Sequence, residues 1–193
     1  MRRPLEGRRI AVFGPESEER TVAATLERAG AIVQPLRSAD AGERWHGGMY
    51  AALVVVGDGG GGDPRLRQLV REFLVVDKPI AVHGNAVSVL LQAGGLAGRK
   101  IAAQGEFRGV VEAAGATCVS DPIHVDDALI TASAGSAVGT FAERVVEAFG
   151  RRMEEHDVDE MSDMSFPASD PPSVSPSTAG PVDAERSVGD GHP

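Results

Sequence analysis

Between residues 9 and 151, hydrophobic positions follow two periods, one typical of β-strands and one typical of α-helices. Short aliphatic runs predict strands, and the run over residues 51–56 is uninterrupted, as expected for a strand buried on both faces. Other segments place apolar residues three and four positions apart, which gives a helix one apolar face. After Pro64 these residues are Leu66, Leu69, Val70 and Phe73. Strands that alternate with such helices predict an α/β domain with a mostly parallel sheet between helices.

The same pattern predicts the order of the elements. Gly30 marks the end of the first helix, because glycine favours the position that follows a helix. Asp126 and Asp127 separate two short strands and predict a hairpin turn. The predicted strands cover residues 10–13, 31–33, 51–56, 79–82, 100–103, 117–119, 123–125 and 129–132. The predicted helices cover residues 16–29, 64–73, 87–91, 110–114 and 138–149.

The composition changes after Arg152. From Glu154 onward the chain is rich in Glu, Asp, Ser, Pro and Gly and has few residues that could bury apolar surface. Such a segment cannot offset the conformational entropy that folding costs. We therefore predict a folded domain over residues 1–152 and a disordered, acidic, Ser/Pro-rich tail over residues 153–193.

The charge of the chain argues against a nucleic-acid partner. The formal net charge is -9, and Lys78 and Lys100 are the only lysines. A surface of this kind repels phosphate backbones. The apolar run that follows the basic start is too short for a signal peptide or a membrane span, so we expect neither a membrane partner nor export. Cys118 is the single cysteine, which suits a reducing cytosol, and we expect a cytoplasmic protein.

A glycine run follows the predicted strand over residues 51–56. Residues 57–62, with the sequence GDGGGG, formally contain the GxGxxG pattern of dinucleotide-binding proteins. Any glycine run satisfies this pattern, and the usual fingerprint opens the first strand-helix unit, so the signal for a dinucleotide is weak. A loop of this kind still offers backbone N–H groups to an anion. The ligand-binding candidates are Gly57, Gly59, Gly60 and Gly61.

A second turn, in the segment PIAVHGNA over residues 79–86, joins a buried strand to a helix. In many α/β hydrolytic enzymes such an elbow projects a nucleophile into the crevice above a helix. Here Gly84 occupies the turn and supplies no nucleophile, although glycine tolerates the backbone angles well. His83 could act as a general base, but Ser88 lies a full turn into the helix, so His83 has nothing to activate. A packed or hydrogen-bonded role is expected for His83.

The remaining polar candidates carry weaker signals. Glu18 falls in the first turn of the first predicted helix, where a carboxylate favours the positive end of the helix dipole. Cys118 lies on a predicted strand away from the elbow, which favours a small buried role. The histidines outside the elbow show no metal-ligand spacing, and we expect neither a metal nor a cofactor.

The order of these elements resembles the ThiJ/PfpI family, which is DJ-1-like and part of the class I glutamine amidotransferase-like superfamily. The resemblance runs from about Leu5 to Gly150 and implies a flavodoxin-like three-layer sandwich. It rests on residues 5–12, 51–56, 78–81 and 93–100.

The resemblance also assigns positions at the elbow. It places Glu18 where the family has the acidic partner of its cysteine. Counting between residues 78–81 and 93–100 without a gap puts Gly84 at the cysteine position and Asn85 at the neighbouring histidine position. Both catalytic side chains are therefore absent, and the site of Glu18, His83, Gly84 and Asn85 is expected to be vestigial.

One branch, the C-terminal domain of large-subunit haem catalases, matches residues 4–11 and 78–86 better. Those domains share the fold, lack the catalytic cysteine and are thought to assist folding, stability or substrate access. The resemblance implies a non-catalytic binding or stabilising module linked to oxidative stress, with a catalase or another stress protein as partner and a homodimer as its assembly. The alternatives are a hydrolase or lyase that uses Glu18 and His83 with water, and a sensor of small anions or nucleotides at the glycine run.

Overall fold

The computed structural model describes residues 3–39, 44–58 and 62–163 of the 193-residue chain. Within these residues, six strands form one sheet in the order β2-β1-β3-β4-β8-β7. Neighbouring strands from β2 to β8 run parallel, and β7 runs antiparallel to β8 at the edge. The strands are β1 (Arg9–Phe13), β2 (Ile32–Leu36), β3 (Ala52–Val55), β4 (Ile80–His83), β7 (Ile123–Asp126) and β8 (Leu129–Ala132).

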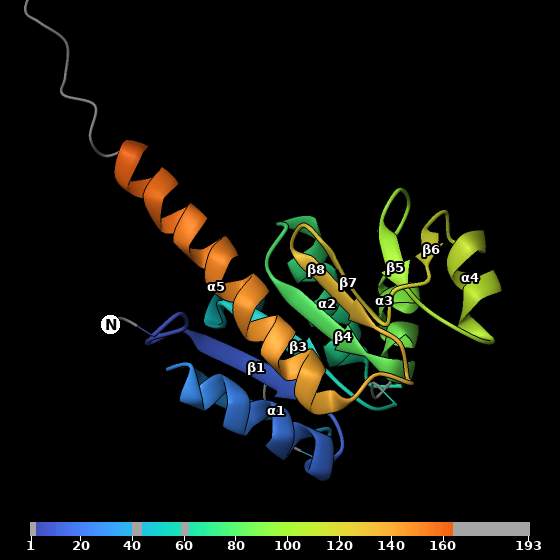
Figure 1. Ribbon diagram of the computed structural model, residues 1–193, viewed down its shortest axis with the longest axis horizontal. Coiled ribbons are helices and arrows are strands. Elements are labelled where there is room, and N and C mark those ends of the chain that lie inside the picture. Colours follow the sequence, from blue (N-terminus) through green and yellow to red (C-terminus); the bar gives the residue numbers. More distant parts are fainter. Residues whose placement is uncertain (1–2, 40–43, 59–61, 164–193) are drawn as a thin grey trace, which may run out of the picture.

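Helices cover both faces of this sheet, which confirms the predicted α/β sandwich. Helices α1 (Glu16–Arg28) and α5 (Val138–Asp163) pack against each other on one face (Figure 1). Helices α2 (Pro64–Val75) and α3 (Val87–Ala93) cover the opposite face. The central strands alternate between the two cores: in β1, Val12 packs with α1 and α5, and Phe13 packs with α2 and α3. Burial on both faces explains why these strands read as continuous apolar runs.

A smaller unit extends the fold beyond β7 and β8. It contains the parallel strands β5 (Lys100–Ala102) and β6 (Thr117–Val119) and the helix α4 (Phe107–Ala113) (Figure 1). The backbone N–H of Ala102 donates to the Thr131 hydroxyl at 2.8 Å, which fastens β5 to β8. Two 3₁₀ turns, η1 (Gly47–Met49) and η2 (Gly84–Ala86), complete the described elements. Among the described residues, no helix combines the length and apolar character needed to cross a bilayer.

The last helix is longer than the composition predicts. We placed the end of the folded domain at residue 152, but α5 continues to Asp163. Met153 is buried, four positions after Phe149, so it extends the same apolar stripe. Asp157 forms an ion pair with Arg8, which precedes β1. The rest of the predicted disordered tail, residues 164–193, lies outside the described residues.

The β7–β8 hairpin turns one residue later than predicted. Asp126 still belongs to β7 and pairs with Leu129, so the loop consists of Asp127 and Ala128. Asp127 adopts a φ of 57°, in the left-handed region. Aspartate tolerates this region better than most residues, and two-residue hairpin loops require it.

An ion-pair network closes the edge of the sheet at which the parallel strands begin. Asp77, in the turn before β4, accepts hydrogen bonds from Arg99 Nη2 and Arg152 Nη2, each at 2.8 Å. Arg152 Nη1 also lies 2.9 Å from Asp127 Oδ1. The network therefore joins the α2–β4 turn, the β7–β8 hairpin and α5. The hydrogen bond from Arg99 is the main reason that the pKa of Asp77 lies below its ordinary value.

We expect Asp77→Asn to lower the free energy of unfolding at pH 7 by about 1 kcal/mol, because two guanidinium groups lose their shared carboxylate. Asparagine retains the left-handed backbone of Asp77, whose φ is 53°. Since the pKa of Asp77 is lowered in the folded state, its contribution is present above the ordinary value of 3.8 and disappears as the pH falls through the lower folded value. Urea unfolding of both proteins at pH 7 and pH 3 measures this difference, which should shrink at pH 3.

The control is Glu112→Gln, which removes an exposed pair with Arg108. It should change stability by less than about 0.5 kcal/mol. An equal effect of the two substitutions would contradict a special role for the Asp77 network.

Candidate functional site at the turn after β4

The turn after β4 has the geometry of a strand-to-helix elbow, but the residue at the turn is a glycine and has no side chain. Gly84 directly follows β4, has a φ of 67° and begins the η2 turn that leads into α3. An added Cβ would lie 3.7 Å from Ala134 Cα and 3.9 Å from the Gly57 carbonyl oxygen, which are ordinary contact distances. The turn therefore has room for a small side chain, and only the positive φ disfavours one.

His83, the last residue of β4, is held firmly. It is 5% exposed, and its ring centroid lies 5.2 Å from that of Phe141. Nε2 lies 2.9 Å from the Ser136 carbonyl oxygen. A carbonyl only accepts, so Nε2 carries a proton and donates it to this oxygen. This arrangement agrees with the packed, hydrogen-bonded role expected from the sequence.

Glu18 approaches His83 from α1. Glu18 Oε2 lies 3.9 Å from His83 Nδ1, which is too far for a hydrogen bond. Both atoms are buried and neither has a hydrogen-bond partner among the described residues. The next residue, Glu19, differs, because it is buried in an ion pair with Arg37 at the end of β2. Both glutamates lie in the first turn of α1, and only the structure separates their surroundings.

Two glycines bring Glu18 close to His83, because they let the backbone after β1 pass close to the backbone after β3. An added Cβ on Gly14 would lie 2.4 Å from Val56 Cγ2, and one on Gly57 would lie 2.5 Å from Pro15 Cδ. Side chains at either position would therefore push α1 away from the end of β3. From the sequence, Gly57 was predicted to bind a ligand, and no role was predicted for Gly14. A Gly-Pro pair directly after a strand is the signal that could have identified Gly14.

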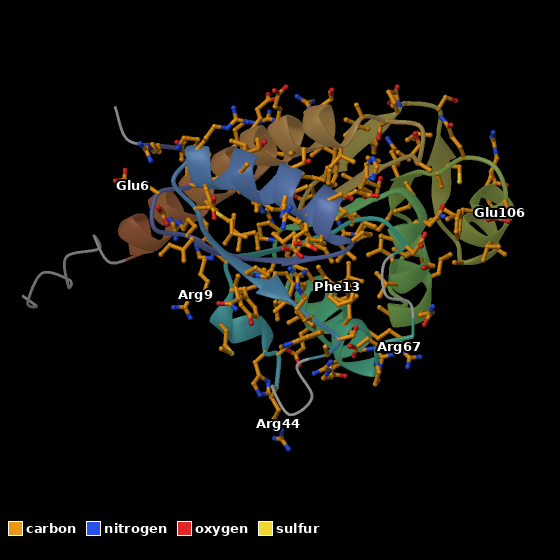
Figure 2. The ribbon with its side chains drawn as sticks, turned by 90° about the horizontal axis from the view of Figure 1, so that it is seen from below. Glu6, Arg9, Phe13, Arg44, Arg67 and Glu106 are labelled. Carbon is orange, nitrogen blue, oxygen red and sulfur yellow. The ribbon has the colours of Figure 1, made fainter. Side chains whose placement is uncertain are left out.

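A cleft of about 380 Å³ opens beside Gly84, where β4, β5 and β8 end. Val87 and Phe107 give it apolar lining, and Glu106 is the one charged residue among those that line it. Figure 2 shows Glu106 at the opposite end of the molecule from Glu6. The polar lining of the cleft comes from Asn85, Gln104, Glu106 and Ser133. Gly84 and Asn85 were predicted from the sequence as site residues, but residues 102–107 and 133–135 were not.

The described part of the predicted glycine loop does not line the cleft. Asn85, which does line it, is exposed, and its Nδ2 donates to Asp58 Oδ1 at 3.4 Å. Gly57 packs on Pro15 and is not among the residues that line the cleft. Gly59, Gly60 and Gly61 lie outside the described residues. Asp77 belongs to the network at the opposite edge of the sheet and does not line the cleft.

No nearby thiol or hydroxyl contacts the free nitrogen of His83 in the described part of the chain. Ser136 Oγ donates to the Ser133 carbonyl at 2.7 Å, and Ser133 Oγ donates to the Pro122 carbonyl at 3.4 Å. Cys118 is half-buried on β6, with Sγ 3.7 Å from the Arg108 carbonyl oxygen. Burial raises the pKa of the Cys118 thiol, which disfavours the reactive thiolate.

Comparison with known proteins identifies relatives for most of the chain. The model of the DJ-1/PfpI family matches residues 43–148, which is more than half of the sequence. No curated protein matches the chain.

Solved structures share the fold at low identity. A ThiJ/PfpI domain protein from Brachyspira murdochii is 19% identical with a TM-score of 0.63, over 76% of this chain and 98% of that one. The putative protease I from Bacteroides thetaiotaomicron is 15% identical with a TM-score of 0.63, over 74% of this chain and 99% of that one. Oxidized DJ-1 from Toxoplasma gondii is 19% identical with a TM-score of 0.60, over 83% of this chain and 100% of that one.

The crossing of the two backbone segments can be tested by adding one methyl group. We expect Gly57→Ala to lower the free energy of unfolding by roughly 2 kcal/mol or more, because alanine disfavours the φ of 70° and its Cβ also overlaps Pro15. Chemical denaturation measures the effect. The control is Gly62→Ala, where an added Cβ meets nothing within 4 Å, and it should stay within about 0.5 kcal/mol of the parent. Equal stabilities of the two variants would count against the tight crossing.

Proposed function

The chain belongs to the DJ-1/PfpI family, and we propose that it is a non-catalytic member that binds a small molecule beside Gly84 without forming a covalent bond to it. The observation that carries the proposal is Gly84 itself, which has the positive φ of an elbow and no side chain. Covalent catalysis requires a thiol, hydroxyl or amine at the point that meets the substrate. Glycine offers only hydrogen there.

The groups around Gly84 support a binding role over nucleophilic catalysis. The hydroxyls of Ser133 and Ser136 donate to backbone carbonyls rather than to His83. His83 uses Nε2 to hold the Ser136 carbonyl, and its Nδ1 faces a carboxylate instead of a nucleophile. A general base without a nucleophile to deprotonate does not complete a catalytic pair.

The cleft supplies the space that a binding module needs. Its volume of about 380 Å³ falls within the range of small-molecule sites. Val87 and Phe107 offer apolar contacts, while Asn85 and Gln104 offer amide groups that can orient a ligand. We infer that the ligand is small and polar on one side.

We extend the proposal to a physiological role on the basis of residues 78–86, which resemble the C-terminal domain of large catalases. In this role the chain is a stabilising module linked to oxidative stress. It assists a catalase that lacks a C-terminal domain of this kind, or another stress protein. We propose a homodimer as the form that does so. Co-incubation tests this role, since the chain should lengthen the half-life of such a catalase in peroxide while an equal concentration of albumin should not.

A second candidate function is hydrolysis or lyase chemistry with water, and the approach of Glu18 to His83 favours it. Two acceptors 3.9 Å apart could orient a water molecule near the space that Gly84 leaves open. Assays with glyoxals, amide substrates and peroxide distinguish the two functions. Turnover by the parent chain that disappears in Glu18→Gln would establish this second function and overturn the first.

The elbow geometry is tested by restoring the missing thiol. We expect the thiol introduced by Gly84→Cys to react with iodoacetamide roughly tenfold or more faster than Cys118, because it lies at an open turn above a helix, whereas burial raises the pKa of Cys118. Mass spectrometry of the labelled peptides measures both rates in the same molecule.

The control variant is Gly84→Ala, which introduces the same backbone strain of about 1–2 kcal/mol without a thiol. It should label only at Cys118 and match the stability of the cysteine variant. Slower labelling at position 84 than at Cys118 would show that the turn does not present its residue to the cleft.

A further inference from the structure

We propose that Thr131 fixes the width of the cleft beside Gly84 and so limits the size of the ligand that the cleft admits, although Thr131 does not line the cleft itself. This inference rests on the proposed function, because it assigns a positioning residue to the same cleft. It follows from three observations: the cleft has two separate walls, strand pairing does not join these walls, and a buried hydrogen bond holds one of them.

The walls of the cleft belong to different parts of the fold. One wall follows β4 and β8 of the six-stranded sheet and consists of Gly84, Asn85, Val87 and residues 133–135. The other wall, residues 102–107, runs from the end of β5 to the start of α4. Figure 1 shows β5, β6 and α4 grouped beside the six-stranded sheet. The width of the cleft therefore depends on how firmly this group is held against β8.

Strand pairing does not fix the second wall. Within the described residues, β5 pairs with β6 alone, in a two-stranded sheet that is separate from the six-stranded one. Apolar packing anchors β5, because Ile101 is buried in the same core as Leu129 of β8. Such packing is not directional, so it permits a strand to tilt or slide. The position of the wall therefore depends on directional links, which are hydrogen bonds.

The link beside the cleft is the hydrogen bond from the Ala102 N–H to the Thr131 hydroxyl oxygen, which is 2.8 Å long and buried. Thr131 is 1% exposed, and its neighbours on β8, Ile130 and Ala132, are also buried. Valine has nearly the same shape, so the hydroxyl is what distinguishes threonine at this apolar position. Ala102 lines the cleft, and residues 103–107 continue the wall. The bond therefore holds the wall where it leaves β5.

Loss of the Thr131 hydroxyl would drive the wall outward. A buried N–H without an acceptor is costly, so the Ala102 N–H would turn to water once its acceptor is removed. Water reaches this N–H when β5 shifts away from β8, and the same shift widens the cleft. A second link, from the Lys100 N–H to Asp126 Oδ2 at 3.1 Å, is exposed and lies at the start of β5, before the wall begins.

The experiment measures access to the cleft through the thiol introduced by Gly84→Cys in the full chain. Iodoacetamide and iodoacetamidofluorescein share a reactive group and differ in size, so the ratio of their labelling rates at position 84 reports the width of the cleft. In this background we expect Thr131→Val to raise the rate of the larger reagent relative to the smaller one by roughly fivefold or more, because the Ala102 N–H loses its acceptor. Thr131→Ser retains the hydroxyl and should stay within about twofold of the unsubstituted ratio. Mass spectrometry separates this thiol from Cys118.

The matched control is Asp126→Ala, which removes the acceptor of the other backbone link on β5 and should leave the labelling ratio unchanged. Hydrogen exchange gives a second measurement that needs no introduced thiol. In the parent chain, the Ala102 amide should exchange roughly a hundredfold or more slowly than the amides of Gln104 and Gly105, which are exposed. Thr131→Val should remove most of this protection and Thr131→Ser should keep it. If Thr131→Val does not fold, as judged by circular dichroism, the exchange of the parent chain decides.

An unchanged labelling ratio in Thr131→Val, an equal rise in Thr131→Ser or Asp126→Ala, or fast exchange of the Ala102 amide in the parent chain would each overturn the inference. These results leave the proposed function intact, because a cleft held by other contacts could still bind a ligand. Slow labelling of position 84 by both reagents, or turnover by the parent chain, would instead count against the proposed function. The exchange of the Ala102 amide would then decide the role of Thr131 by itself.

Discussion

The site depends on how closely the backbone after β1 passes the backbone after β3. Gly14 has Val56 where its side chain would be, and Gly57 has Pro15 in the same position. Because neither glycine carries a Cβ, α1 can begin directly against the end of β3. That start places Glu18 beside His83, at the end of the next strand. The approach of Glu18 to His83 therefore originates in the packing of two strand ends.

The fold was largely predictable because its central strands are buried on both faces. Residues such as Val54 and Leu53 serve opposite cores, so the strand had to be continuously apolar and was easy to recognise. The end of α5 was not predictable from composition. Beyond residue 152 the helix is held by Met153 and by the pair between Asp157 and Arg8, which lie 149 positions apart in the chain. An acidic segment looks unfolded until its partner at the other end of the sequence is known.

The candidate site was predictable only where it is local in sequence. The strand, turn and helix around Gly84 are contiguous, so the position of the glycine and the burial of His83 could be inferred from spacing. The cleft beside them is not contiguous, because the bond between Ala102 and Thr131 brings the β5–α4 loop to the end of β8. Neither loop carries a motif. The interpretation of the glycine run as a ligand loop also omitted the steric role of Gly57, which becomes visible only when Pro15 is seen against it.

The conformation of Gly84 has a consequence for how this domain can change over generations. Two of the four glycine codons become cysteine codons by replacement of a single nucleotide, and the turn already has room for an added Cβ. The backbone angle, not a steric clash, is the obstacle to such a change. A side chain at this turn would therefore cost little beyond the strain of its backbone angle, so the chemistry that the elbow presents can change while the packing of the core stays the same.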